Sequence, residues 1–225
     1  MKRVLKIVLP VFLVTIMVLI GILLKGGVVG IFTLVLGVMN VYFTSHGKWY
    51  SYIFGILYTV VSTVIYYNNS QYGAVIMNVF CFEPILITGL INWLKHKTSD
   101  SVLTKSLDKG KRIKVILIII ASSVLMGLLL SLIKTENGAF LDSFSQMLNV
   151  AANILLMLRY KECWSIWVIG GIVEITLWIR INIIGGENAV IMLINSFIYF
   201  SMSIYGYINW CKIEKNQQKI NTAKE

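Results

Sequence analysis

The sequence predicts an all-α polytopic membrane protein, and two observations lead to this fold class. Hydrophobic residues make up 57% of the chain and charged residues only 13%. In a typical soluble domain about half of the residues are hydrophobic and about a quarter are charged. The charges are also clustered, because uncharged runs of 18, 22 and 19 residues separate Lys6 from Lys25, Lys25 from Lys48 and Lys114 from Lys134. About 20 helical residues cross a bilayer, so these runs are typical of membrane spans.

Hydropathy along the chain predicts about eight transmembrane helices. The first follows a basic start that is similar to a signal peptide, but its apolar run is too long and no small-residue cleavage site precedes Lys25, so we expect it to be retained. The next three are separated by short polar loops, and the basic segment 95–114 divides them from the last four. The expected spans are 7–24, 27–44, 49–67, 72–94, 115–133, 139–158, 163–179 and 188–210.

The basic residues predict which side of the membrane each loop faces. When the loops are placed alternately on two sides, 17 of the 20 Lys and Arg residues fall on the side of both termini, and only Lys25, Lys134 and Arg180 fall on the other. Cytoplasmic loops carry such an excess, so we expect both termini in the cytoplasm. This distribution also explains the net charge of +10 without a nucleic acid as partner.

The two parts of the chain on either side of segment 95–114 repeat each other. WYSYIFG at 49–55 aligns with WSIWVIG at 164–170, and AVIMN at 74–78 aligns with AVIML at 189–193, both at an offset of 115. GLINWLK at 89–95 aligns with GYINWCK at 206–212 at an offset of 117. The repeats indicate a duplicated unit of three helices.

The repeats predict a 3+1+3 organisation in which a linker helix joins two three-helix bundles. Because three is odd, a single extra helix between the bundles makes them parallel. Parallel repeats are one of the known plans of secondary transporters, with the substrate site at the repeat interface, and a membrane scaffold or sensor is the alternative. The expected parts are an N-terminal helix (1–26), a first repeat (27–94), a basic loop with the linker helix (95–138), a second repeat (139–212) and a cytoplasmic tail (213–225).

Two segments carry a resemblance to a known family: LMLRYKECWSIW at 156–167 and YGYINW at 205–210. With the 3+1+3 plan, they resemble the PnuC family of bacterial vitamin transporters over roughly residues 27–212. The resemblance implies a SWEET-like fold in the bacterial inner membrane and facilitated diffusion of a nucleoside-like vitamin. In most members this vitamin is nicotinamide riboside, which a cytoplasmic kinase traps for NAD biosynthesis; other members carry thiamine, riboflavin or deoxynucleosides. The chain departs from the family pattern at Gly171, where many members have Asn or Asp.

A stripe of residues at helical spacing predicts the substrate site in the second repeat. Residues three or four apart share a helix face, and the stripe consists of Trp164, Trp167, Gly171, Glu174 and Trp178. Indole rings stack on flat heteroaromatic solutes and attract cations, although tryptophan is also common at membrane interfaces. A carboxylate within a span faces a cavity or a partner, so Glu174 is either a substrate contact or half of a structural pair. The aligned stripe of the first repeat is less polar: Trp49, Tyr52, Ile56, Thr59 and Thr63.

Amide side chains supply further candidate contacts. Gln146, Asn149 and Asn153 share one helix face, and Asn153 falls near a pocket glutamine of the family, as the resemblance implies. Amides suit hydroxyl and carboxamide groups, but they also join helices to one another. The predicted substrate contacts are Trp164, Trp167, Gly171, Glu174, Asn149, Asn153, Asn195 and Asn78.

Other chemistry finds no support in the sequence. His46 and His96 have no partners at catalytic or metal-ligand spacing, and nucleotide-binding and hydrolase motifs are absent. Glu83 precedes Pro84, so we expect a structural role for it. We therefore expect no enzyme activity, no metal and no cofactor. The expected partners are the vitamin and the lipid bilayer, a cytoplasmic kinase that acts on the product, and, as an open alternative, a second copy of the chain.

Overall fold

The computed structural model describes residues 2–23, 27–68, 75, 77–98, 101–132, 139–183 and 189–222. These residues are α-helical apart from turns, two isolated β-bridges and a short π-helical stretch. They form two units, Met1–Val102 and Leu103–Glu225. The expected all-α fold class is confirmed.

In the first unit, each helix packs against the next helix in sequence. The elements are α1 (Lys2–Leu23), α2 (Gly27–Ser45), α3 (Ser51–Asn68), η1 (Asn78–Phe82) and α5 (Glu83–Lys95). Small residues allow close approach, because a side chain at Gly21 of α1 would collide with Ile31 of α2.

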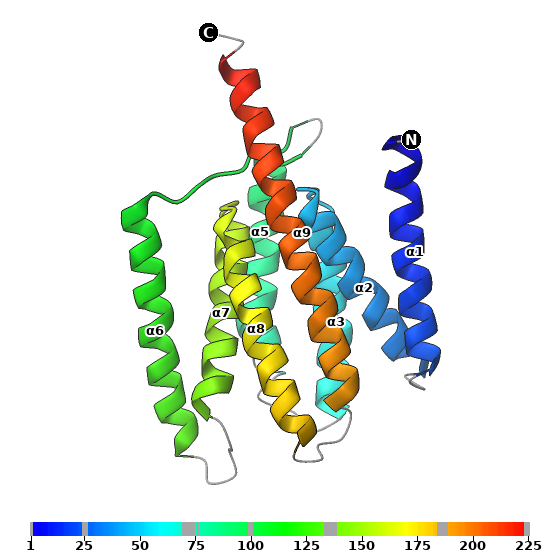
Figure 1. The fold of residues 1–225 in the computed structure, drawn as a ribbon, viewed down its shortest axis with the longest axis vertical. Coiled ribbons are helices and arrows are strands. Elements are labelled where there is room, and N and C mark those ends of the chain that lie inside the picture. Colours follow the sequence, from blue (N-terminus) through cyan, green and yellow to red (C-terminus); the bar gives the residue numbers. More distant parts are fainter. Residues whose placement is uncertain are drawn as a thin grey trace. The chain divides into compact units, whose positions relative to one another are not determined.

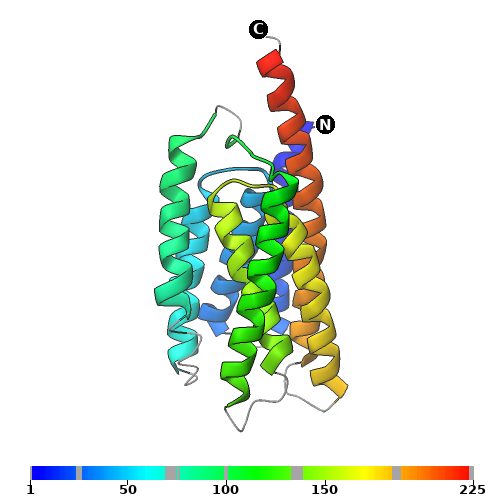
Figure 2. The same ribbon diagram turned by 90° about the vertical axis from the view of Figure 1, so that its left-hand side faces the viewer.

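The second unit follows the same plan with four long helices (Figures 1 and 2). They are α6 (Lys109–Ser131), α7 (Ala139–Met157), α8 (Glu162–Ile183) and α9 (Ala189–Thr222), each packed against the next. Figure 1 shows that the C-terminal part of α9 extends beyond the ends of the other three helices of this unit.

Two helix ends differ from the expected ones for local reasons. Helix α6 begins at Lys109 rather than near residue 115, because the carboxylate of Asp108 accepts a hydrogen bond from the Lys111 N–H at 2.8 Å and so caps the first turn. Helix α9 continues through Thr222 into the segment that the sequence assigned to a polar tail. This continuation has a role in the second unit, as shown below.

Proline explains the π-helical stretch before α5. Pro84 has no backbone N–H and its ring crowds the preceding turn. The Glu83 N–H donates to the carbonyl oxygen of Asn78, five residues earlier, so the chain passes through a wider turn without leaving the helical path.

Length and composition of the helices fit a membrane protein. In the described part of the chain, three apolar stretches are long enough to cross a bilayer: Gly27–Ser45, Lys109–Leu129 and Glu162–Arg180. Three shorter apolar helices accompany them: Pro10–Leu23, Ser51–Val64 and Ser143–Met157. Side chains such as Leu23, Val28 and Leu132 are more than three-quarters exposed, as expected for residues that face lipid rather than water.

The turns that open α3 and α8 reveal the register of the internal repeat. The Gly47 N–H donates to Thr44 O and the Lys48 N–H to Phe43 O. Four residues of the second unit make the same pattern: the Arg159 N–H donates to Leu156 O and the Tyr160 N–H to Leu155 O. Both are Schellman turns with a left-handed residue, Gly47 at φ 64° and Arg159 at φ 70°.

The equivalent turns correct the alignment of the repeats. Gly47 and Arg159 are 112 positions apart, and so are the first residues of α2 and α7. The sequence alignment at an offset of 115 is therefore wrong by three residues in this region: Trp164 corresponds to Tyr52 and not to Trp49. One helical turn separates the two registers, so the aromatic residues at 49 and 52 both offer a match to Trp164 in sequence.

Candidate functional site

Helices α8 and α9 pack through a buried tryptophan over a glycine. A side chain at Gly206 would collide with the indole ring of Trp164. Trp164 also meets Trp210 edge to face, with ring centroids 6.0 Å apart, and both tryptophans are fully buried. The glycine and the tryptophan of GYINW, four residues apart on α9, thus hold Trp164 of α8 between them.

The same arrangement occurs in the first unit. A side chain at Gly89 would collide with the ring of Tyr52, and Tyr52 meets Trp93 edge to face at 5.0 Å. One helical turn further, Lys97 lies over the ring of Trp49 at 5.8 Å in the first unit, and Lys161 forms an ion pair with Glu214 in the second. We call these three layers (glycine, tryptophan and cation layer) the aromatic ladder of each unit.

Trp167 lies beside Trp164 at the start of α8. The two rings are edge to face with centroids 5.2 Å apart. Trp164 is fully buried, and its indole N–H has no hydrogen-bond partner among the described residues. Trp167 is half-buried, so part of its ring is accessible to a solute. The structure therefore buries Trp164 between helices, whereas part of the Trp167 ring stays accessible.

Glu174 contacts the neighbouring helix α7. The amide nitrogen of Asn149 donates to Glu174 Oε1 at 3.4 Å, and both side chains are half-buried. Asn153 lies one turn further along α7, where its amide nitrogen donates to the carbonyl oxygen of Asn149 at 2.9 Å. Three of the predicted contacts are thus brought together on one side of α8, with a long carboxylate–amide bond as the link between the helices.

Gly171 faces a different neighbour. A Cβ atom at this position would lie 2.9 Å from the ring of Phe200, on α9. Gly170, the preceding residue, has Leu148 of α7 as its nearest neighbour at 3.9 Å from the corresponding Cβ position. The stripe expected from spacing is therefore divided: Trp164 and Gly171 pack against α9, whereas Glu174 contacts α7.

Asn78 belongs to a polar group in the first unit. Its amide nitrogen lies 3.2 Å from Ser62 Oγ and 3.0 Å from Thr63 Oγ1, and it also reaches the carbonyl oxygen of Thr59 at 3.5 Å. Asn78 is buried, so these bonds join η1 to α3. Asn195 is part of α9, but its side chain lies outside the described residues. The structure thus gives Asn78 a helix-joining role within its own unit.

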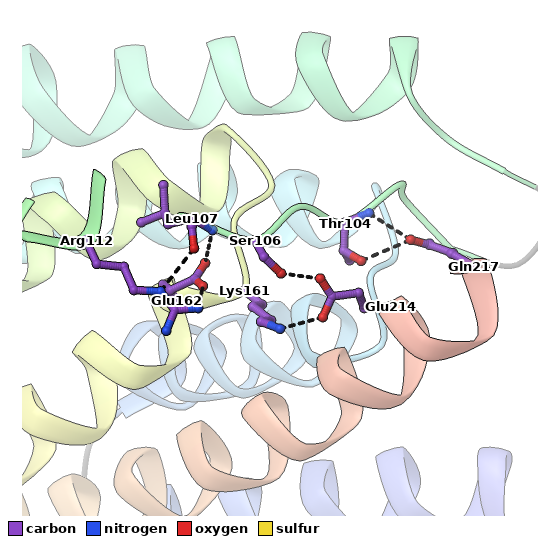
Figure 3. Close-up of polar contacts among 8 residues, drawn as sticks. All are labelled: Thr104, Ser106, Leu107, Arg112, Lys161, Glu162, Glu214 and Gln217. Atoms are coloured by element: carbon purple, nitrogen blue, oxygen red, sulfur yellow. Dashed lines mark hydrogen bonds and ion pairs between the residues drawn. The ribbon is translucent and has the colours of Figure 1, made fainter. Parts of the chain in front are cut away.

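A polar cluster at the start of α8 was not expected from the sequence (Figure 3). Lys161 Nζ lies 2.5 Å from Glu214 Oε2, and the Ser106 hydroxyl donates to the other carboxylate oxygen of Glu214. On the same segment, the N–H and hydroxyl of Thr104 donate to Gln217 Oε1 at 3.1 and 3.0 Å. Glu214 and Gln217 lie on the extension of α9, so the sequence could have indicated this cluster only if the helix had been predicted to continue past residue 212.

The second half of the cluster fastens the start of α6. Glu162 accepts a hydrogen bond from the Leu107 N–H at 3.1 Å and forms an ion pair with Arg112 at 2.8 Å. Partial burial acts to raise the pKa of Glu214, but the hydrogen bonds from Lys161 and Ser106 and the charges of Lys161 and Arg112 outweigh it and hold the pKa below its ordinary value. The Lys161–Glu214 pair is therefore charged near neutral pH.

The described residues offer no metal site, since no three His, Cys, Asp or Glu side chains gather among them. His46 and His96 serve locally: the Nδ1 atom of each lies within 3 Å of a carbonyl oxygen one turn earlier, on Tyr42 and Asn92 respectively. The side chains that the structure describes at this place are thus aromatic, amide and carboxylate groups.

Comparisons with known proteins agree with this architecture. The sequence pattern of the family described as "Nicotinamide mononucleotide transporter" matches residues 27–212, which is most of the chain. The nicotinamide riboside transporter PnuC of Neisseria mucosa is 28% identical over 186 residues, which cover 80% of this chain and 71% of that protein. The protein of the same name from Haemophilus influenzae is 27% identical over 184 residues, which cover 80% and 77%.

A solved structure, described as the crystal structure of the vitamin B3 transporter PnuC, has the same fold. It matches with a TM-score of 0.78 at 24% sequence identity, covering 93% of this chain and 91% of that one. The match agrees with the helical architecture described above. The chain is therefore a multi-pass membrane protein and belongs to the nicotinamide mononucleotide transporter family, the family of the PnuC transporters.

Proposed function

We propose that this protein carries nicotinamide riboside across the cytoplasmic membrane by facilitated diffusion and so supplies NAD biosynthesis. Family membership and the names of the two relatives support the substrate class. The observation that carries the proposal is the arrangement on α8, where a half-buried Trp167 precedes a carboxylate, Glu174, that Asn149 of α7 holds by a long hydrogen bond.

The chemistry of this arrangement suits a flat cation with polar substituents. Trp167 and Glu174 are seven residues apart, which is roughly 10 Å along a helix, a span comparable to a nucleoside. The pyridinium ring of nicotinamide riboside would stack on the indole with a cation–π contribution of about 0.5–2 kcal/mol. Glu174 would provide the counter-charge, and the amides of Asn149 and Asn153 would serve the hydroxyl and carboxamide groups.

The departure at Gly171 is compatible with this proposal. The ring of Phe200 lies where a side chain at position 171 would begin, so an Asn or Asp there would require Phe200 to move. A hydrogen-bonding side chain at 171 is thus replaced by packing. We infer that Glu174, one turn further along α8, takes over the polar contact with the solute.

Thiamine is the second candidate, because its thiazolium ring is also a flat cation that would pair with Glu174. Riboflavin and deoxynucleosides carry no positive charge and would leave the carboxylate without a counter-charge, which is costly at a half-buried position. The charge of the solute therefore separates the two leading candidates from the other vitamins that relatives carry. A scaffold or sensor without transport remains the alternative from another class.

For the topology, we propose the 3+1+3 plan with an additional N-terminal helix. The first repeat would comprise α2, α3 and the η1–α5 helix (within 27–94), and the second α7, α8 and α9 (within 139–212), with α6 as the linker helix in segment 95–138. Residues 1–26 and 213–225 would flank them. The excess of basic residues supports cytoplasmic termini. Reporter fusions placed at the C-terminus and after residue 134 test this: activity of a cytoplasmic reporter only at the C-terminus is expected.

The proposal also concerns partners. Facilitated diffusion accumulates a solute only if a second reaction consumes it, so a cytoplasmic kinase that phosphorylates the riboside is the expected functional partner. Assembly of a homo-oligomer is open to measurement by light scattering in detergent. Uptake that does not respond to a proton or sodium gradient would agree with facilitated diffusion and exclude ion coupling through Glu174.

A ligand panel tests the proposed substrate. Thermal unfolding of the purified protein is measured with nicotinamide riboside, thiamine, riboflavin and deoxyadenosine, followed by uptake of each labelled compound into proteoliposomes. We expect stabilisation and uptake with nicotinamide riboside, smaller or no effects with the two uncharged compounds, and loss of the cation preference in Glu174→Gln. Equal responses to all four, or none, would contradict the proposal.

A further inference from the structure

The third layer of the aromatic ladder in the second unit is an ion pair with little exposure. Lys161 Nζ and Glu214 Oε2 lie 2.5 Å apart, and their side chains are only 19% and 15% exposed. For comparison, the ion pair between Lys111 and Asp108 in the same unit is 61% and 60% exposed. Exposed pairs contribute little because water screens them, whereas a pair shielded to this degree restrains its two helices more strongly.

The position of this ion pair connects it to the tryptophans. Lys161 lies one turn before Trp164, and Glu214 lies one turn after Trp210. Gly206, Trp210 and Glu214 therefore form one face of α9, at a spacing of four residues, and this face meets Trp164 and Lys161. The ion pair is the end of the same α8–α9 contact that holds Trp164.

The contact at Trp164 leaves the helices little freedom to slide. The indole ring fills the space over Gly206, so a shift of α8 along α9 would press it against the backbone of α9. Yet the Trp164 indole N–H has no hydrogen-bond partner among the described residues, so no polar bond of that ring sets its height on α9. One turn away, the bond from Lys161, just before α8, to Glu214 of α9 provides a polar restraint.

The ion pair is in turn held by the segment before α6. Ser106 donates to Glu214, and Thr104 donates twice to Gln217, so two successive turns of the α9 extension are fastened to residues 104–106. The segment itself pairs with the turn before α8, because the Lys105 N–H donates to Arg159 O and the Lys161 N–H donates to Lys105 O. Figure 3 shows Thr104 and Ser106 of the segment before α6, and Lys161 of the turn before α8, directed at Glu214 and Gln217.

We propose that Lys161 and Glu214, supported by Ser106, are positioning residues that set the height of Trp164 and Trp167 against α9. This inference rests on the proposed function, because Trp167 is the stacking surface for the solute. Loss of the ion pair lets the start of α8 move, which misplaces Trp167 relative to Glu174 without removing any group that touches the solute. In the first unit the cation of this layer, Lys97, is exposed and lies over the ring of Trp49.

The test compares Lys161→Gln, Glu214→Gln and the exchange K161E/E214K with wild type. Lys111→Gln, which removes an exposed ion pair at the start of α6, is the matched control. Two readouts are used: KM and the maximal rate of nicotinamide riboside uptake into proteoliposomes, and acrylamide quenching of Trp167 without ligand. The contribution of Trp167 is the difference between each protein and its Trp167→Phe counterpart.

We expect each single substitution to raise KM about fivefold, in the range of coupling between contacting residues, with a smaller change in maximal rate and stronger quenching of Trp167. The exchange restores the opposite charges and should bring both readouts to within about twofold of wild type. Lys111→Gln should match wild type. Unchanged quenching in both single variants, or single variants that are altered and not restored by the exchange, would overturn the proposal.

The two proposals fail in different ways. If wild type takes up no nicotinamide riboside, the proposed function fails, while quenching in the ligand-free protein still reports whether the ion pair positions Trp167. If wild type transports and the single variants neither transport differently nor change their quenching, the positioning role alone is refuted. Elution of every variant as a folded species in size-exclusion chromatography guards against loss by unfolding.

Discussion

The two halves of the molecule share one scaffold but complete it with different chemistry. Each half turns through a left-handed residue, Gly47 before α3 or Arg159 before α8, and each clamps an aromatic ring over a glycine. In the first half the third layer of the ladder is an exposed lysine over Trp49; in the second it is a shielded ion pair. The cation of this layer also comes from a different segment in each half: Lys97 follows α5, whereas Lys161 precedes α8.

The interior polar groups differ in the same direction. In the first half, Asn78 bonds to the hydroxyls of Ser62 and Thr63, so these groups satisfy one another. At the corrected offset of 112, Ser62 corresponds to Glu174, which has a single long bond from Asn149. The polar groups of the first half thus bond to one another between helices, whereas among the described residues the carboxylate of the second half has one long bond, and we propose that it meets the solute.

Substitution of the ladder glycines should produce the largest effect and should show that the clamp is common to both halves. Gly206→Ala and Gly89→Ala each place a methyl group against a buried aromatic ring, so each should destabilise the protein by about 1–3 kcal/mol. Thermal unfolding in detergent measures this. Gly30→Ala is the matched control, because nothing lies within 4 Å of its added methyl group and alanine favours the helix. Tolerance of one glycine but not the other would show that the halves do not share the clamp.

Removal of the Glu174 carboxylate should weaken binding of nicotinamide riboside, whereas a substitution at the equivalent position of the first half should not. Glu174→Gln keeps the shape and the contact with Asn149 but loses the charge, so affinity for nicotinamide riboside should fall about tenfold, as for a lost charged hydrogen bond of about 1.5 kcal/mol. Ser62→Ala, at the equivalent position of the first half, should change stability rather than affinity. Titration calorimetry gives both affinities, and a larger loss of affinity in Ser62→Ala would reverse the assignment.

The two turns should respond differently to substitution. Gly47→Ala places a side chain at φ 64° and should cost about 1 kcal/mol of stability. Arg159→Gly relieves the same strain at φ 70° but loses the hydrogen bond from the guanidinium to Leu103 O at 3.1 Å, so the two effects should nearly cancel. Chemical denaturation distinguishes them. A large loss of stability in Arg159→Gly would show that the Arg159 side chain makes stabilising contacts besides its hydrogen bond to Leu103 O.

The smallest effect is expected from pH, because the Lys161–Glu214 pair stays charged over a wide range. Partial burial opposes both charges, but the hydrogen bond and the charges around the pair outweigh it, so the pKa of Glu214 is lowered from 4.5 and that of Lys161 is raised from 10.5. Glu214 thus stabilises the fold at pH values above its ordinary pKa, and this contribution is lost only as the pH falls through its lowered pKa. Lys161 stabilises the fold at pH values below its ordinary pKa, and this contribution is lost only as the pH rises through its raised pKa.

Acrylamide quenching of Trp167 should therefore be constant between about pH 5.5 and 8.5. The surrounding charges, Glu162 with Arg112, are themselves paired and do not change this expectation. A transition within that range that disappears in Glu214→Gln would contradict the assignment of the ion pair as permanently formed.

The helices and their order could be predicted from the sequence because apolar runs between charge clusters report burial in lipid directly. The repeat was also visible, but its register was not. Trp49 and Trp164 are both tryptophans, but they do not occupy equivalent positions. In the structure the position equivalent to Trp49 is Lys161, and the position equivalent to Trp164 is Tyr52. Identity of side chains misleads where a repeat keeps the geometry of a contact and exchanges its chemistry.

The candidate site could be predicted only in part. The meeting of Asn149 with Glu174 agrees with their shared character as polar groups within spans. The packing of Gly171 against Phe200 and the burial of Trp164 could not be foreseen, because spacing gives a face of the helix but not the neighbour that covers it. The Glu214 cluster depends on the continuation of α9, which hydropathy alone ends near residue 210.

Uptake of nicotinamide riboside by variants of the two halves tests the central claim, that the second half holds the solute. Initial rates into proteoliposomes are compared for wild type, the pair W167L/E174Q in the second half and the pair S62A/T63A in the first. We predict that W167L/E174Q loses uptake while S62A/T63A keeps it at a comparable amount of folded protein. Retained uptake in W167L/E174Q would contradict the account.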